Sequence, residues 1–146
     1  MKTKCLIVSA LFFISLISCS QDFQKLPGSK VDNAKLNIAR NFAEKYMEAS
    51  VNGTYYKFSD EAIDQLKSSL TPERQKAVYE QLESKFGGYE SMEYAETWES
   101  SDDSGTMIFR FKAKFSKSPS LLEIKVVVNR DNKIAGLWIK PWSDLL

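Results

Sequence analysis

The sequence predicts an α+β fold in which three N-terminal helices pack on a curved, four-stranded antiparallel β-meander. Two patterns along the chain support this class. Between residues 31 and 86, apolar residues recur at the three- and four-residue spacing of helices. After Gly87-Gly88, apolar and polar residues alternate, which is typical of strands with one buried face and one wetter face.

Three helices are expected before the sheet. The first begins near a capping pair, Ser29 and Asp32, and ends at Asn52-Gly53. Ser59 is the expected N-cap of the second helix, and Pro72 opens the third, where its missing N–H costs no hydrogen bond. The apolar stripes of the three helices are Val31, Ala34, Ile38, Phe42 and Tyr46; Ile63, Leu66 and Leu70; and Val78, Leu82 and Phe86.

The clearest strand signal lies in residues 106–116, where every odd position from 107 to 115 is apolar. A hairpin with the preceding strand, residues 89–99, places Tyr94 opposite Phe111 on the inner face, against the helices. The same register places Glu93 opposite Lys112 on the outer face.

The last two strands are expected to continue the meander. The turn at residues 117–120 predicts that Phe111 pairs with Val126. The final strand ends at Pro141, which cannot donate to a ladder. Its alternation sends three residues to the outer face, namely Ile134, Gly136 and Trp138.

The N-terminus carries the pattern of an export signal. Residues 1–4 are basic, and the apolar run over residues 5–17 is shorter than the roughly 20 residues that span a bilayer. Leu16-Ile17-Ser18-Cys19 resembles the bacterial lipobox, which implies cleavage before Cys19 and lipidation of that residue. An uncleaved signal anchor, or a plain signal peptide with a chance cysteine, would be the alternative interpretation.

These features predict how the chain is organised. We expect a lipoprotein signal peptide over residues 1–18, a lipidated tether over residues 19–29 and a single α+β domain over residues 30–146. Pro27-Gly28 favours an unstructured tether. The mature protein would lie in the bacterial cell envelope, attached to the membrane by acyl chains on Cys19.

The order of the elements resembles the nuclear transport factor 2-like superfamily, whose cone-shaped α+β domain is also called a cystatin-like roll. Within it, several short motifs are similar to domain-of-unknown-function family 3887, over nearly all of residues 30–142. This resemblance implies a fold and a secreted context, and it implies no activity. The motifs are Phe42-Ala43, Asn52-Gly53-Thr54-Tyr55, Leu70-Thr71-Pro72-Glu73, Gly87-Gly88-Tyr89 and the run from Asp131 to Pro141.

The interior of the cone is one candidate site. Enzymes of the superfamily typically hold an Asp or a His–Asp pair there, and this chain has no histidine. Strict alternation places Glu96 on the inner face, where burial would raise its pKa. A β-bulge or a rim position would instead turn Glu96 away. The ligand-binding residues that this site would use are Tyr46, Tyr94, Glu96 and Trp98, although Tyr46 also suits a core position.

The outer face of the sheet is the second candidate site. Its apolar residues, Ile108, Val127, Ile134 and Trp138, predict a contact surface for a second copy or a protein partner. The C-terminal Pro141-Trp142 is expected at its edge, unless the tail covers Trp138 instead. Basic residues on this face could meet anionic lipid or a partner, with Glu93 and Glu123 neutralising part of the charge. They are Arg110, Lys112, Lys114 and Lys125.

Composition narrows the function classes. The 20 basic and 19 acidic residues nearly cancel, so nucleic-acid binding is not expected. No catalytic residue, metal ligand or cofactor is predicted. Three hypotheses remain: a non-catalytic envelope lipoprotein whose cone binds a small ligand or a protein, an interaction or immunity-like module acting through the outer face, and, disfavoured, an acid–base enzyme using Glu96.

The first prediction concerns anchoring. The Cys19→Ser variant is expected to leave the membrane fraction, because no other segment is apolar enough to hold the protein there. Fractionation with detergent-free washing measures this. A variant that stays with the membrane would identify the N-terminus as an uncleaved anchor.

Overall fold

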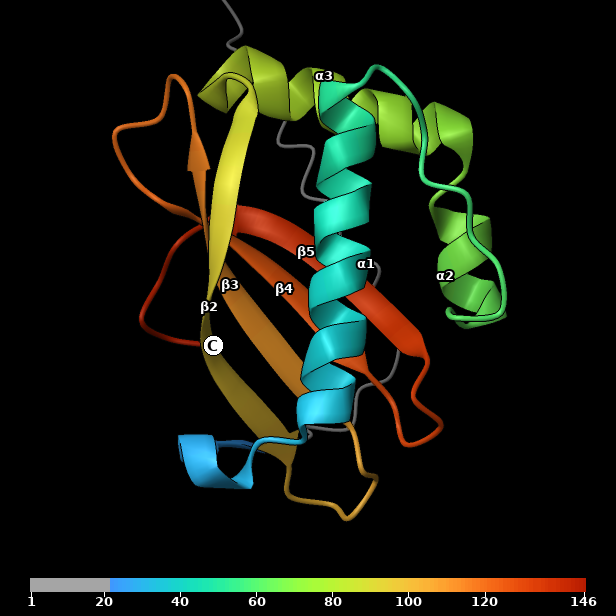
Figure 1. Ribbon diagram of the computed structural model, residues 1–146, viewed down its shortest axis with the longest axis vertical. Coiled ribbons are helices and arrows are strands. Elements are labelled where there is room, and N and C mark those ends of the chain that lie inside the picture. Colours follow the sequence, from blue (N-terminus) through green and yellow to red (C-terminus); the bar gives the residue numbers. More distant parts are fainter. Residues whose placement is uncertain (1–21) are drawn as a thin grey trace, which may run out of the picture.

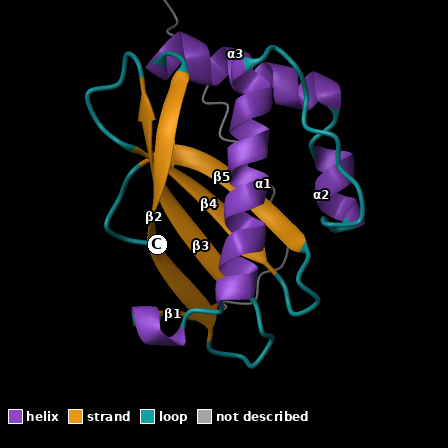
Figure 2. Ribbon diagram, viewed as in Figure 1, coloured by secondary structure: helices purple, strands orange, loops and turns teal. Residues whose placement is uncertain are grey.

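A five-stranded antiparallel sheet with the order β1-β2-β3-β4-β5 curves around helix α1 in the computed structural model, which describes residues 22–146 (Figure 1). The α+β class, the three α-helices and the antiparallel meander are confirmed, and the predicted number of strands is wrong by one (Figure 2). The elements are β1 (Phe23–Lys25), a 3₁₀ turn (Gly28–Lys30), α1 (Asn33–Val51), α2 (Asp64–Ser69), α3 (Pro72–Phe86), β2 (Tyr89–Ser100), β3 (Met107–Phe115), β4 (Leu122–Val128) and β5 (Ile134–Pro141).

The additional strand, β1, lies within the segment that was expected to be an unstructured tether. Phe23 pairs with Ser100 and Lys25 pairs with Trp98 at the end of β2. The carbonyl of Asp22 also accepts a hydrogen bond of 2.8 Å from the backbone N–H of Ser101. A three-residue strand is too short to show alternation, so the sequence carries no signal for it. The predicted signal peptide and Cys19 lie outside the described residues.

The helix ends show which capping predictions were right. Asp32, and not Ser29, caps α1, because its carboxylate accepts from the backbone N–H groups of Ala34 and Lys35. Pro72 is the first residue of α3, as expected, and Thr71 caps that helix. The N-cap of α2 is Ile63, so the prediction of Ser59 was wrong. Within residues 22–146, none of the helices has both the length and the apolar character that crossing a bilayer requires.

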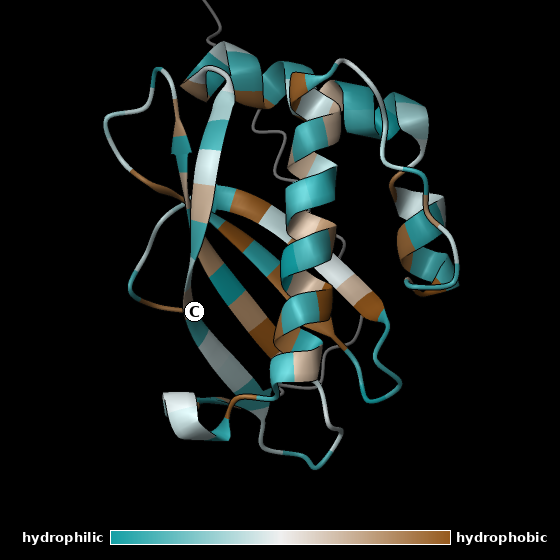
Figure 3. Ribbon diagram, viewed as in Figure 1, coloured by the Kyte–Doolittle hydropathy of each residue, from teal (hydrophilic) through white to brown (hydrophobic). Residues whose placement is uncertain are grey.

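The core lies between α1 and the inner face of the sheet. Apolar residues of α1, β3 and β4 face one another there, while the solvent side of α1 is hydrophilic (Figure 3). The predicted pairs of the first hairpin, Tyr94 with Phe111 and Glu93 with Lys112, are confirmed. The fully buried side chains of this core include Ala39, Ala43, Tyr46, Met47, Phe109, Phe111, Ile124 and Val126.

The register between β3 and β4 differs from the prediction by two residues. Phe111 pairs with Ile124, and Phe109 takes the position opposite Val126. The predicted pairing of Phe111 with Val126 was wrong because a shift by two residues keeps every side chain on its expected face. Alternation alone cannot distinguish two such registers.

A bulge in the β4–β5 pair reverses the predicted orientation of Ile134. Val128 pairs with Ile134 and Val127 pairs with Gly136, which leaves Ala135 as the extra residue. Ile134 therefore points into the core and is fully buried. Its backbone also bonds the segment before α2, donating to the carbonyl of Glu61 and accepting from the N–H of Ile63. The prediction that Ile134 lies on the outer face was wrong.

The second prediction tests the assignment of the inner face. Phe111 is fully buried between Tyr94 and Ile124, so Phe111→Ala is expected to lower the free energy of unfolding by roughly 3–5 kcal/mol. Chemical denaturation of the chain from residue 22 measures the loss. Tyr55→Ala is the control, because that aromatic side chain is 41% exposed and its removal should change stability little. Equal losses in the two variants would contradict the assignment.

Candidate functional site

A β-bulge in β2 carries Glu96 out of the core. The pairing with β3 shifts between Tyr94 and Glu96, and Ala95 is the additional residue. Thr97 then takes the inner position opposite Phe109, where it is fully buried and its hydroxyl lies 2.8 Å from that of Tyr94. Glu96 and Trp98 move to the outer face. The predicted inward orientation of Trp98 was wrong, and of the two orientations considered for Glu96, the outward one given by a β-bulge is present.

The structure does not bring the four predicted ligand-binding residues together. Tyr46 belongs to the core, where burial and the neighbouring Tyr79 raise its pKa far above the ordinary range. Tyr94 is half-buried on the inner face, whereas Glu96 and Trp98 lie on the outer face. Core side chains fill the space between α1 and the sheet. Two surface hollows of about 430 and 540 Å³ are lined by residues of α1 and β2, and by the α1–α2 link with α2 and α3.

On the outer face, Glu96 joins an ion network centred on Arg110, which is fully buried. The guanidinium of Arg110 donates through Nε to the buried carboxylate of Glu123 at 2.6 Å and through Nη1 to Glu96. Lys25 of β1 forms a second ion pair with Glu96, and Lys140 of β5 lies 3.4 Å from Glu123. We call these five residues the Arg110 network. It connects all five strands.

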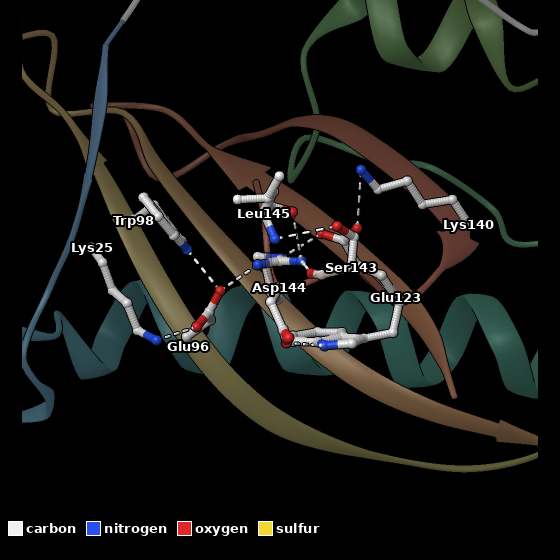
Figure 4. Close-up of polar contacts among 10 residues, drawn as sticks. Lys25, Glu96, Trp98, Glu123, Lys140, Ser143, Asp144 and Leu145 are labelled. Carbon is white, nitrogen blue, oxygen red and sulfur yellow. Dashed lines mark hydrogen bonds and ion pairs between the residues drawn. The ribbon is translucent and has the colours of Figure 1, made fainter. Parts of the chain in front are cut away.

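The C-terminal tail, residues 142–146, covers this network (Figure 4). Nη2 of Arg110 donates to the backbone carbonyls of Ser143 and Leu145, the latter at 3.3 Å. The ring of Trp142 stacks on the guanidinium, with 4.3 Å between its centroid and Cζ of Arg110. The tail therefore folds back onto the outer face, as expected. It covers Arg110 and not Trp138, so the alternative that the tail covers Trp138 was wrong.

Trp138 remains uncovered and is 41% exposed. Its ring lies directly over Gly136, since a Cβ added to that glycine would come within 2.3 Å of the ring. Lys125 lies 5.3 Å from the ring centroid, and Val127 beside it is half-buried. We call these four residues the Trp138 patch. Of the other predicted contact residues, Ile108 is on this face but buried, and Ile134 belongs to the core.

A comparison with known families identifies the family of this chain. Residues 43–137 match the model of a family described as a protein of unknown function (DUF3887). The chain belongs to this family. The match includes Glu96, Arg110 and Glu123, while Trp138 and the tail lie beyond it. No curated protein and no solved structure matches the chain.

The electrostatics of this family member do not favour acid–base chemistry at Glu96. Burial alone would raise its pKa, but hydrogen bonds from Lys25, Trp98 and Arg110 outweigh burial and lower the pKa below its ordinary value. A carboxylate with a lowered pKa is a weak base. Within residues 22–146, no group of three His, Cys, Asp or Glu side chains could hold a metal ion.

Sequence reasoning placed two of the five network residues correctly and did not predict the network itself. Arg110 and Glu123 were both expected on the outer face, in facing strands, and partial neutralisation by Glu123 is confirmed. Glu96 was named as a candidate, but the alternation could not show whether a bulge precedes it, so its place in this network was not predicted. The contacts of Ser143 and Leu145 use backbone carbonyls, which no side-chain pattern reveals.

The third prediction follows from the lowered pKa of Glu96. The folded pKa lies below that of the unfolded chain, so the ionised carboxylate stabilises the fold above about pH 5 and this stabilisation is lost as the pH falls through the folded pKa. Glu96→Gln should therefore be less stable than the parent at pH 7, with a difference that shrinks toward pH 3. Urea denaturation across this range measures it. Glu93→Gln, an exposed position on the same strand, is the control, and a pH-independent difference would contradict the prediction.

Proposed function

We propose that the protein is a non-catalytic bacterial envelope lipoprotein whose domain, of the nuclear transport factor 2-like type, acts through contacts of its outer sheet face. One observation carries this proposal. The side chains that could have formed a reactive or ligand-binding interior are buried in the core or turned outward, while Trp138 stands exposed on the outer face. Exposed aromatic residues in such a setting are typical anchors of contact surfaces.

The alternative functions receive less support. A small ligand inside the cone would need space that core side chains occupy. An acid–base enzyme would need a carboxylate with a raised pKa, and that of Glu96 is lowered. A lipid on Cys19 would keep the outer face close to its contact partner in the envelope.

The fourth prediction tests this function in the full chain in its own envelope. A photo-crosslinking amino acid replaces Trp138 in one variant and Tyr55 in another, because both side chains are 41% exposed and Tyr55 lies in the α1–α2 link. Irradiation is expected to give a discrete adduct at position 138 at several times the yield at position 55. Equal yields at both positions would contradict a contact function of the outer face. The mass of the adduct shows whether the contact is a protein, a second copy or lipid.

A further inference from the structure

We propose that the partner of the outer face is the anionic surface of the bilayer that holds the lipid anchor, so that the domain lies on the membrane. This inference rests on the proposed contact function and on lipidation of Cys19. It names the chemical class of the partner: phospholipid headgroups that carry negative charge.

The chain between the expected anchor and the sheet is short. The described residues begin at Asp22, whose carbonyl already bonds the end of β2. Asp22 follows Cys19 by three residue steps, with two residues between them, and an extended chain of three steps spans at most about 11 Å. The tether of 11 residues that the sequence predicted would have held the domain off the membrane. The short segment between Cys19 and Asp22 cannot do so.

The outer face of the sheet lies next to the start of β1, where the expected anchor joins the domain. Three residues after Asp22, the ammonium group of Lys25 forms its ion pair with Glu96 on the outer face. From Glu96 the contacts continue through Arg110 to the carbonyl of Leu145 in the tail. The anchored end of the domain and the outer face are therefore parts of one connected cluster, whereas the inner face is covered by α1.

The outer face carries aromatic, apolar and basic side chains close together. Arg110, Lys125 and Trp138 are neighbours in one row across β3, β4 and β5. Two large apolar side chains are exposed here, Trp138 at 41% and Leu145 at 79%. Tryptophan is enriched at the headgroup level of membranes, where one part of its ring system is apolar and another is wet.

Positive charge exceeds negative charge on this surface. The carboxylates of Glu96 and Glu123 are already engaged by the cations of the Arg110 network. Lys112 and Lys125 add charge next to the rings of Trp142 and Trp138, at 4.7 and 5.3 Å from their centroids. Of the other acidic residues on this face, Glu93 pairs with Lys112, and the carboxylate of Asp144 accepts a hydrogen bond from the ring N–H of Trp142. Basic side chains beside exposed apolar ones are the combination that binds anionic bilayers.

The test uses the full lipidated chain in vesicles, with an environment-sensitive fluorophore on a single introduced cysteine. Leu145→Cys reports from the outer face, and Val51→Cys is the matched control, because Val51 is 62% exposed at the end of α1. Vesicles contain phosphatidylcholine alone or with phosphatidylglycerol. Quenching by brominated lipid is expected at position 145 in the anionic vesicles, several-fold above position 51, and should fall in high salt.

Two further variants separate docking from folding. Lys125→Glu, with the label at position 145, should reduce the docked-to-undocked ratio about fivefold or more, since each basic residue near an anionic surface contributes about that factor. Lys57→Glu, in the α1–α2 link, makes the same charge change and should leave the ratio unchanged. Equal quenching at positions 145 and 51, or quenching that is independent of phosphatidylglycerol, would overturn the proposal. Protein adducts at position 138 without lipid quenching would overturn the membrane partner and leave the contact function intact.

Discussion

Because of the extra residue at Ala95, the inner face of the sheet is apolar and the ionic side chains lie on the outer face. Without the bulge, strict alternation would bury Glu96 under α1, at the cost of several kcal/mol for an unpaired carboxylate in the core. With it, Thr97 enters the core with its hydroxyl beside that of Tyr94, and Glu96 meets Arg110. The inner face becomes an uninterrupted apolar surface, and the ionic groups gather on the outer one.

Burying Arg110 makes the C-terminal tail part of the fold. A guanidinium removed from water is destabilising unless its donors are bonded, and two carboxylates supply only part of what Arg110 needs. The carbonyls of Ser143 and Leu145 accept two more hydrogen bonds, while Trp142 shields the flat side of the group. The tail is therefore held by a charge-assisted contact, although its own side chains are largely exposed.

The sequence predicted those features that repeat along the chain. Alternation identified β2 to β5 and placed Phe111 inside, and the helical spacing identified α1 and α3. Features that depend on one inserted residue could not be predicted in this way. The bulge at Ala95 moved Glu96, and the bulge at Ala135 moved Ile134, because a single extra residue reverses the orientation of the residues on one side of it relative to those on the other. The strand β1 is too short to leave any pattern.

The structure also gives a reason for Gly136 that stability alone does not supply. Glycine weakens the interior of a strand, and valine at this position would suit β5 better. Any Cβ here would collide with the ring of Trp138, whose Cζ3 and Cη2 atoms would lie 2.3 and 2.4 Å from it. The glycine thus leaves the space that the ring of Trp138 occupies, and the side chain remains 41% exposed. The residue that weakens the strand is therefore the one that leaves room for an exposed aromatic ring on the outer face.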